Sequence, residues 1–348
     1  MNKSFQAWRI PSPYLAVIDL ARYVANIIST EKILRSVSLY LRSLRPEQWT
    51  KNLIVFAAPL FSVRLNLLSL AGSLLAFASF CCISSSFYLF NDVADLASDR
   101  QHPIKRYRPI ATGLIPVPIA ITIAVSLLLF SLLIGWLHSP SLAYVLLAYG
   151  VLQTAYNLKL KHLPILDLFA IATGFILRAW AGAVATNVTL SAWFLLCTAM
   201  LALFLGIEKR KAELRFFSSS DRKTRSVLQY YSKSLLTRME STVTTATVMS
   251  YSLWSAGPLL NGATTSWMLV TLPFVMYGIF RYQLLGDPEA AAAHKDAAYP
   301  QAKGGQYKER TERPEEIFLT DLPLQIIVVG WVLIVIAILL LKKHGLIV

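Results

Sequence analysis

Residues 69–99 read SLAGSLLAFASFCCISSSFYLFNDVADLASD and contain the feature that decides the fold. The part from 69 to 90 has no charged side chain, and a helix needs about 20 mostly apolar residues to cross the hydrocarbon core of a bilayer. Amide and carboxylate groups begin at Asn91, directly after this apolar run. The stretch therefore predicts a membrane-spanning helix that ends in a polar motif.

Similar apolar runs recur along most of the 348 residues, and the composition agrees with them. The chain is 55% hydrophobic and only 15% charged, with a mean hydropathy of +0.54, whereas an average globular domain has about 25% charged residues. A soluble enzyme, a disordered chain and a secreted disulfide scaffold are excluded. We predict an all-α, polytopic membrane protein with about nine spans. The predicted spans are 52–67, 69–90, 115–137, 140–158, 164–186, 190–208, 238–260, 264–284 and 322–341. The first is short and contains Arg64.

The charges predict the orientation and the partners. Lysine and arginine exceed aspartate and glutamate by 33 to 19, and such a basic balance indicates anionic lipid or a phosphate-bearing substrate, with no nucleic acid. With nine spans and a cytoplasmic N-terminus, 29 Lys and Arg side chains fall on the cytoplasmic side and three outside. Cytoplasmic loops carry such an excess, so we predict a protein of the cytoplasmic (inner) membrane whose N-terminus and active site face the cytoplasm.

Two segments lie outside the predicted bundle. Residues 1–40 form an N-terminal cytoplasmic or interfacial extension, in which 14–28 have the pattern of a short amphipathic surface helix; residues 41–348 form the transmembrane domain. Residues 286–314 are of low complexity and are expected to be a flexible loop or lid. The three cysteines lie in apolar runs and are interpreted as packing residues: Cys81, Cys82 and Cys197.

The polar motif after the 69–90 run has the spacing of a metal site. Asn91, Asp95 and Asp99 are four residues apart, so on a helix each is offset by only about 40° from the one before. Hard oxygen ligands of this kind bind Mg²⁺, which is usually completed by substrate phosphates. Asp92 is added as a candidate catalytic residue, and a solvated membrane-edge loop that merely fixes topology is the alternative.

A basic run follows and is predicted to bind phosphate directly. Its members are His102 in a supporting role and the cations Lys105, Arg106 and Arg108.

At these residues the sequence resembles the UbiA superfamily of intramembrane prenyltransferases, through Asn-x-x-x-Asp-x-x-x-Asp followed by His-Pro-x-Lys-Arg-x-Arg-Pro-Ile. The resemblance covers roughly residues 40–343. It includes Arg45-Pro46-x-Gln48-Trp49-x-Lys51-Asn52, Tyr156-Asn-Leu-Lys-Leu160-Lys161-His162 and Arg178-Ala-x-Ala-Gly182. It implies an all-helical enzyme of nine spans that uses Mg²⁺ at the first aspartate-rich motif.

Within the superfamily the sequence is most similar to the decaprenyl-phosphate phosphoribosyltransferase branch. The resemblance rests on Leu190-Ser-x-Trp193-Phe194, Glu208-Lys209-Arg210-Lys211-Ala-Glu213-Leu214, Pro314-Glu315-Glu316 and Asp321. Typical members have a second aspartate-rich motif where this chain has Glu208 to Glu213. The cations Lys209 and Arg210 are therefore expected to bind a separate phosphate of the donor, although a stop-transfer charge cluster is the alternative.

Several residues are assigned to the lipid phosphate or to supporting roles. Lys51, Tyr156, Lys161 and Arg178 are expected to hold the lipid phosphate, together with Lys159 and His162, although the basic cluster at 156–162 also suits interfacial snorkelling. Asp167 and Arg178 are about three turns apart on one face and are candidates for lining one polar cavity. The supporting residues are His102, Asp167, Glu208 and Glu213, and the loop carboxylates Glu315, Glu316 and Asp321 either close over the site or are solvated charges.

The combined interpretation is a Mg²⁺-dependent transferase that joins 5-phosphoribose, from 5-phosphoribosyl 1-diphosphate, to a polyprenyl phosphate. One alternative is transfer of a prenyl group from its diphosphate to an aromatic acceptor. A transporter is the alternative from another class, but it predicts polar residues on both sides of the membrane. The sequence leaves the oligomeric state open, a homo-oligomer included.

Overall fold

The computed structural model describes residues 37–62, 66–102, 105–218, 226–287, 317 and 321–347. Within these ranges the chain is helical and has no β-strand. The α-helices are α2 (Ala57–Phe61), α3 (Leu67–Ala94), α4 (Leu96–Gln101), α5 (Val117–His138), α6 (Pro140–Leu158), α7 (Leu166–Ala185), α8 (Ala192–Ser218), α9 (Lys233–Ser255), α10 (Leu272–Gly286) and α14 (Leu322–Lys343). The 3₁₀ helices are η1 (Pro46–Phe56), η2 (Lys105–Tyr107), η3 (Leu160–His162), η4 (Ser226–Tyr230), η5 (Pro258–Leu260) and η6 (Ser266–Thr271).

The chain divides into two compact units. The smaller unit comprises residues 1–46 and 88–122, and the larger unit comprises residues 47–87 and 123–348. Residues 1–36 and 288–316 lie outside the described residues, so the predicted surface helix 14–28, nearly all of the extension 1–40 and nearly all of the loop 286–314 stay predictions. The boundary between extension and transmembrane domain at residue 40 stays a prediction as well.

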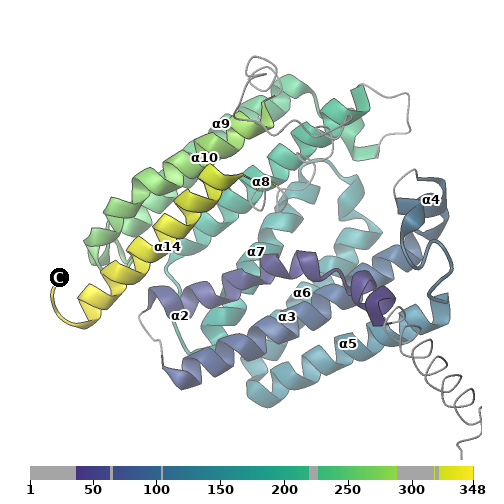
Figure 1. Cartoon of the computed structure of the whole chain (residues 1–348), viewed down its shortest axis with the longest axis horizontal. Helices are drawn as coiled ribbons and strands as arrows, with labels where there is room; N and C mark the ends of the chain where they lie inside the picture. Colours follow the sequence, from purple (N-terminus) through teal and green to yellow (C-terminus); the bar gives the residue numbers. More distant parts are fainter. Residues whose placement is uncertain are drawn as a thin grey trace, which may run out of the picture. The chain divides into compact units, whose positions relative to one another are not determined.

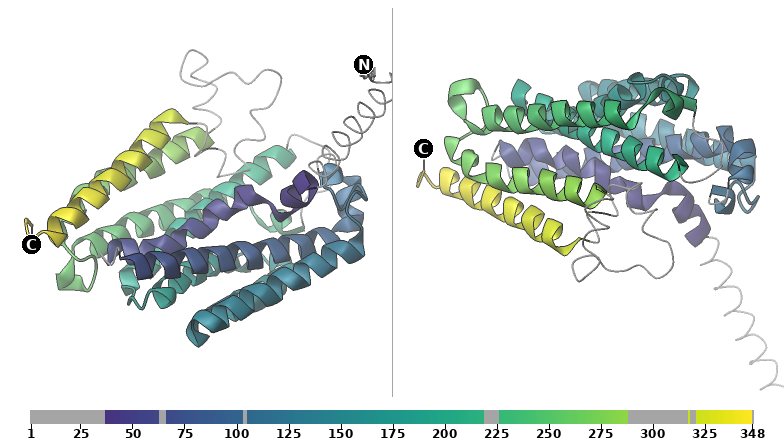
Figure 2. Two further views of the ribbon diagram at one scale, coloured as in Figure 1. Left: turned by 60° about the horizontal axis from the view of Figure 1, so that its bottom comes forward. Right: turned by 90° about the horizontal axis from the view of Figure 1, so that it is seen from above.

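Helix–helix packing builds the larger unit. In chain order α6 packs on α7, α7 on α8 and α8 on α9, and α10 contacts both α9 and α14. Helices α9, α10 and α14 run alongside one another in Figures 1 and 2. Side chains cap several of these helices at the N-terminus, where backbone N–H groups lack partners. Ser139 accepts from Leu142, Ser232 from Leu235 and Asp321 from Leu324.

Close backbone approach brings η1 and α7 together. An ideal Cβ built on Gly182 would lie 1.9 Å from the carbonyl oxygen of Val55, a distance that no side chain tolerates. Glycine at this position of α7 therefore lets the segment that leads into α2 lie directly against it. This packing positions Asn52 in the interior, where it is fully buried.

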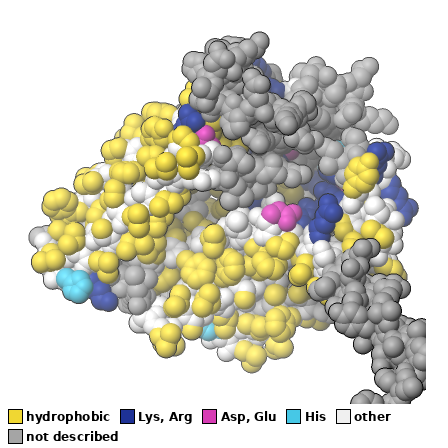
Figure 3. Space-filling view, viewed as in Figure 1, with side chains coloured by type: hydrophobic (Ala, Val, Ile, Leu, Met, Phe, Trp, Pro, Cys, Tyr) yellow, Lys and Arg dark blue, Asp and Glu magenta, His cyan; other side chains and the backbone are white. Residues whose placement is uncertain are grey.

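The surface is apolar over much of the helical part. Figure 3 shows hydrophobic side chains over a large share of the visible face, and several large ones on α5 and α14 are exposed, among them Leu129, Leu133, Val329 and Leu333. In water such a surface would be a strong aggregation liability. Hydrocarbon is the solvent that this surface fits.

Among the residues that the structure describes, six helices are long and apolar enough to cross a membrane, judged by length and composition. They are Leu67–Ala94, Val117–His138, Leu166–Ala185, Ala192–Arg215, Ser266–Gly286 and Leu322–Lys343. Each overlaps one of the nine predicted spans, so the prediction of an integral, all-helical membrane protein is confirmed.

The other three predicted spans do not belong to that set. The segment predicted at 52–67 is split into η1 and the five-residue α2. The segments predicted at 140–158 and 238–260 are the helices α6 and α9. Both are rich in Ser, Thr, Tyr or Gln, and α9 carries Arg238 and Glu240 near its start.

Candidate active site

The acidic motif lies at the junction of α3 and α4, in the smaller unit. Helix α3 ends at Ala94 and Asp95 precedes α4, so the predicted single helix is interrupted at the central carboxylate. The backbone N–H of Asp95 nevertheless donates to Asn91 (2.9 Å), and that of Asp99 donates to Asp95 (2.8 Å). These i to i−4 bonds preserve the helical register, so the spacing that predicted one face survives the break.

Two carboxylates of this motif are buried and bound by arginine. Arg108 donates from Nη1 to Oδ1 of Asp92 (3.0 Å) and to Oδ2 of Asp99 (2.6 Å), and Arg45 also pairs with Asp92. Asn91 and Asp95 are half-buried. Unpaired buried carboxylates cost several kcal/mol, so the two arginines account for the burial of Asp92 and Asp99.

Arg45 is a participant that the sequence interpretation did not assign. Its φ of 54° places it in the left-handed region, which a non-glycine residue adopts at an energetic cost. Its guanidinium stacks over the ring of Tyr88 at 5.0 Å from the centroid. The available sequence signal was Arg45-Pro46, because proline disfavours helical geometry at the residue before it; it did not indicate the pair with Asp92.

The basic run after the motif separates into exposed and engaged cations. Lys105 and Arg106 are exposed, and Arg106 donates to the hydroxyl of the adjacent Tyr107 (2.7 Å). His102 accepts the backbone N–H of Lys105 at Nδ1 (3.3 Å), which closes the turn that presents them. Among these predicted phosphate ligands, Arg108 is bound by two carboxylates of the motif, Asp92 and Asp99.

The donor set suits a hard divalent cation in chemistry. It consists of one amide oxygen and three carboxylates, from Asn91, Asp92, Asp95 and Asp99, and Mg²⁺ prefers such oxygens. In the described parts of the chain, no three His, Cys, Asp or Glu side chains are gathered into a metal cluster. At Asp92 and Asp99 the guanidinium of Arg108 supplies the positive charge. The fit of these residues to Mg²⁺ is therefore one of donor type.

A second charged cluster lies at the end of α8, in the larger unit. Arg210 is almost fully buried, donates from Nε to Oδ2 of Asp167 (2.8 Å) and pairs with Glu213. The sequence predicts that Arg210 binds a donor phosphate. Two carboxylates already engage its guanidinium, so in this arrangement Arg210 ties α8 to the start of α7.

Tyr231 completes this cluster from the segment between α8 and α9. Its hydroxyl donates to Oδ1 of Asp167 (2.9 Å) and accepts the backbone N–H of Ile165 (2.6 Å). Ile165 has a φ of 69°, a strained value for a β-branched residue. Burial raises the pKa of Tyr231 to about 12, so it remains a neutral donor to Asp167 at physiological pH.

Lys211 forms a third set of contacts on the same helix. Its ammonium donates to Glu208 (2.9 Å) and also pairs with Glu240 on α9, which accepts from Gln283 on α10 (2.8 Å). Lys209 is half-buried. The sequence interpretation missed Glu240, although an ionisable residue inside a predicted span was the signal that should have identified it.

Arg178 lies deep in the larger unit, in a neutral surrounding. It donates to Oδ1 of Asn52 (2.7 Å), to the carbonyl of Gly174 (2.8 Å) and to the hydroxyl of Tyr149 (2.8 Å). The rings of Phe80, Tyr149 and Phe175 surround its guanidinium. Asp167 pairs with Arg210, so Asp167 and Arg178 have different partners, and the shared cavity stays a prediction.

The remaining predicted residues lie nearer the surface. Lys51 pairs with Gln48, Tyr156 and Lys161 are half-buried, and Lys159 and His162 are exposed. Asp321 forms a two-bond ion pair with Arg281 at the start of α14. Glu315 and Glu316 lie outside the described residues.

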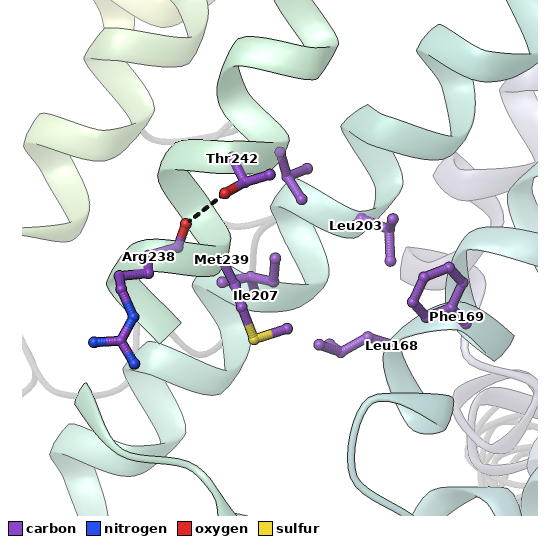
Figure 4. Close-up of a pocket in the computed structure, with 8 residues that line it drawn as sticks. Leu168, Phe169, Leu203, Ile207, Arg238, Met239 and Thr242 are labelled. Carbon is purple, nitrogen blue, oxygen red and sulfur yellow. Dashed lines mark hydrogen bonds between the residues drawn. The ribbon is translucent and has the colours of Figure 1, made fainter. Parts of the chain in front are cut away.

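An apolar groove of about 300 Å³ runs between α7, α8 and α9 (Figure 4). Arg238 is the charged residue among those that line it, and Thr242 donates its hydroxyl to the Arg238 carbonyl (3.0 Å). The lining residues are Leu168, Phe169, Leu203, Ile207, Arg238, Met239, Thr242 and Val243. A second apolar groove, of about 440 Å³, lies between α5 and α6. Both offer surfaces suited to hydrocarbon chains.

Comparison with known proteins decides the family. The UbiA prenyltransferase family matches residues 53–299. The chain belongs to this family. The UbiA fold is found again in the structure of a UbiA homolog from Archaeoglobus fulgidus bound to GPP and Mg²⁺, at a TM-score of 0.62 and 18% identity, covering 86% of this chain and 99% of that one.

Sequence relatives within the UbiA family are more similar. The decaprenyl-phosphate phosphoribosyltransferase of Mycolicibacterium smegmatis is 38% identical over 309 residues, covering 85% of this chain and 91% of its own. The enzyme of the same name from Mycobacterium tuberculosis is 36% identical over 298 residues, covering 84% and 91%. The resemblance seen in the sequence motifs is thereby confirmed.

Proposed function

We propose that this UbiA-family chain transfers 5-phosphoribose from 5-phosphoribosyl 1-diphosphate to a polyprenyl phosphate and releases diphosphate. The observation that carries the proposal is the 36–38% identity to two decaprenyl-phosphate phosphoribosyltransferases over 84–85% of this chain. Lys209 at the end of α8 supports it, because a cation there suits a donor that carries a phosphate besides its diphosphate. The neighbouring Arg210 and Lys211 are paired with carboxylates.

The reaction forms a bond between a lipid phosphate oxygen and C1 of the ribose and breaks the bond from C1 to the diphosphate. The nucleophile is already an anion, so the protein does not need a strong general base. Its contribution is positioning and electrostatic stabilisation of the leaving group. A Mg²⁺ ion held by Asn91, Asp95 and Asp99 would neutralise charge on the departing diphosphate.

Donor binding is divided among the basic residues. Lys105, Arg106 and Arg108 of the smaller unit are assigned to the diphosphate, since guanidinium and ammonium groups bind phosphate through charge-assisted hydrogen bonds. Lys209 is assigned to the 5-phosphate. Arg210 acts as a positioning residue, because Asp167 and Glu213 hold its guanidinium.

The acceptor's chain needs an apolar surface and its phosphate needs a cation. The groove between α7, α8 and α9 offers apolar side chains with Arg238 among them. Lys51, Tyr156 and Lys161 remain our candidates for the lipid phosphate. The fourth predicted ligand, Arg178, is enclosed by neutral acceptors and aromatic rings, so we assign it to holding η1 against α7.

The finer topology is part of the same proposal. We infer nine spans with the N-terminus and the basic loops on the cytoplasmic side, because that assignment places 29 Lys and Arg side chains inside against three outside. Helices α6 and α9 and the η1–α2 segment would then cross the bilayer inside the bundle, where polar side chains have protein partners.

One assay tests the function. Purified protein in lipid vesicles receives Mg²⁺, a polyprenyl phosphate and either labelled phosphoribosyl diphosphate or labelled prenyl diphosphate with an aromatic acceptor. Label from the phosphoribosyl donor is expected in the lipid fraction. Incorporation from the prenyl donor alone would replace this function with ordinary prenyl transfer.

A further inference from the structure

Arg108 pairs with two carboxylates of the acidic motif, and one of them, Asp99, is assigned to the metal ion. Its Nη1 lies 3.0 Å from Asp92 Oδ1 and 2.6 Å from Asp99 Oδ2, and Arg45 also pairs with Asp92. Two carboxylates thus face two guanidinium groups. A divalent cation that approaches these carboxylates without an anion is repelled by the two guanidinium groups and must displace them.

The two sides of this contact differ in exposure. The side chains of Asp92 and Asp99 are 4% and 2% exposed, whereas that of Arg108 is 24% exposed. The backbone of Arg108 is anchored separately, since its N–H donates to Lys105 (2.9 Å) and its carbonyl accepts from Thr112 (3.0 Å). The guanidinium can therefore swing away by side-chain rotation, while the carboxylates stay in place.

Movement of the Arg108 guanidinium away from Asp92 and Asp99 is favourable only when other charges replace it. It would leave two buried carboxylates with less compensating charge, which is unfavourable unless another cation replaces it. The freed guanidinium in turn needs an anion, and a diphosphate is a bidentate partner of suitable geometry. Both conditions are met when a metal ion and a diphosphate arrive together.

We propose that Arg108 is a positioning residue that exchanges partners, from Asp92 and Asp99 in the substrate-free protein to the donor's diphosphate when a divalent cation takes over the carboxylates. Metal and diphosphate then bind with positive coupling, and by linkage each raises the affinity for the other. This inference rests on the proposed function only in that the donor carries a diphosphate.

Mn²⁺ binding to the full-length protein in detergent tests the exchange, with free Mn²⁺ measured by electron paramagnetic resonance and inorganic diphosphate as the anion. Wild-type protein is expected to bind Mn²⁺ weakly alone and at least about tenfold more tightly with diphosphate. Arg108→Gln should bind Mn²⁺ alone about tenfold more tightly than wild type and lose most of the enhancement. Arg42→Gln, an exposed arginine three residues before Arg45, is the matched control and should behave as wild type.

Unchanged Mn²⁺ affinity of Arg108→Gln without diphosphate would overturn the exchange. If that variant does not fold, Arg108→Lys serves instead: its single ammonium competes less well, so Mn²⁺ affinity should still exceed that of wild type, and equal affinity rejects the proposal. The outcome is independent of the donor's sugar, because a prenyl diphosphate would give the same coupling. Failure of phosphoribosyl transfer is therefore seen separately, in the labelling assay.

Discussion

Arg210 and Asp167 form an ion pair whose Nε to Oδ2 distance is 2.8 Å, and their side chains are only 1% and 0% exposed. The pair joins α8 to the first turn of α7, next to the strained Ile165. Because Tyr231 donates to the same carboxylate, three segments of the larger unit meet at Asp167. Loss of either charge is therefore expected to lower the stability of the fold more than the affinity for substrate.

Arg210→Met is expected to lower the free energy of unfolding by about 3–5 kcal/mol, because it leaves Asp167 buried with its charge uncompensated. Thermal unfolding of the protein in detergent measures the effect. The double variant Asp167→Leu, Arg210→Met should recover part of the loss, since it removes both charges. Arg238→Gln, at an exposed position on α9, is the control. Single variants as stable as wild type would contradict a structural role for the pair.

Lys209→Ala should act on the donor instead. A charge-assisted contact to the 5-phosphate contributes about 1.5–3 kcal/mol, so its loss should raise the KM for phosphoribosyl diphosphate roughly 10- to 150-fold. The KM for polyprenyl phosphate should change little. Steady-state kinetics with intact donor and with a donor lacking the 5-phosphate measure this, and an equal proportional loss with both donors would remove Lys209 from the site.

Asp95→Asn is expected to abolish turnover and leave the unfolding midpoint unchanged, because the half-buried Asp95 is assigned to the metal. Asp99→Asn should abolish turnover and also lower the midpoint, because Asp99 is buried and paired with Arg108. Chelation of divalent cations should reproduce the activity loss in the parent protein. Full activity in chelator, or near-normal turnover of both variants, would refute the metal assignment.

Gly182→Ala should destabilise the protein strongly, since the new methyl group would lie 1.9 Å from the carbonyl oxygen of Val55. Gly278→Ala is the matched control, because its Cβ would meet Ile327 at an ordinary 3.8 Å and alanine favours a helix over glycine. Unfolding midpoints of the two variants should move in opposite directions. A Gly182→Ala protein as stable as wild type would show that η1 and α7 are not in contact.

Single-cysteine labelling tests the orientation. Cysteines placed in 91–112, 208–236 and 286–320 should react with a membrane-impermeant reagent only from the cytoplasmic side. The single cysteines are introduced into a protein without native cysteines. In it Cys81 is replaced by serine, because the sulfur of Cys81 accepts a hydrogen bond from Asn52 (3.3 Å) and a hydroxyl keeps an acceptor there. Labelling of any of these loops from outside would show that the count of nine spans is wrong.

The helical fold and the acidic motif could be predicted from local sequence. Apolar runs of about 20 residues specify spanning helices without reference to the rest of the chain. The i, i+4, i+8 spacing from Asn91 to Asp99 likewise predicted a helical register, which the backbone bonds preserve. The polar side chains of α6 and α9 weaken the apolar signal, so membrane crossing by these two helices stays a prediction.

The partners of charged side chains could not be predicted, because they come from distant segments. Arg45 and Asp92 are 47 positions apart and Asp167 and Arg210 are 43 apart, and only tertiary packing selects one carboxylate among several for a given arginine. The prediction of Arg210 as a phosphate ligand followed from its neighbours in sequence. One of the two carboxylates that bind it, Asp167, lies on another helix.

The contact of Val55 with Gly182 also bears on how a lipid substrate reaches the protein interior. Where a carbonyl oxygen leaves no room for one methyl group, an isoprenoid chain several ångströms wide cannot slip between η1 and α7. Asn52 and Arg178 fasten the same seam from within. Under the proposed function, we therefore expect a polyprenyl phosphate to enter from the bilayer between other helices, not at the contact of Val55 with Gly182.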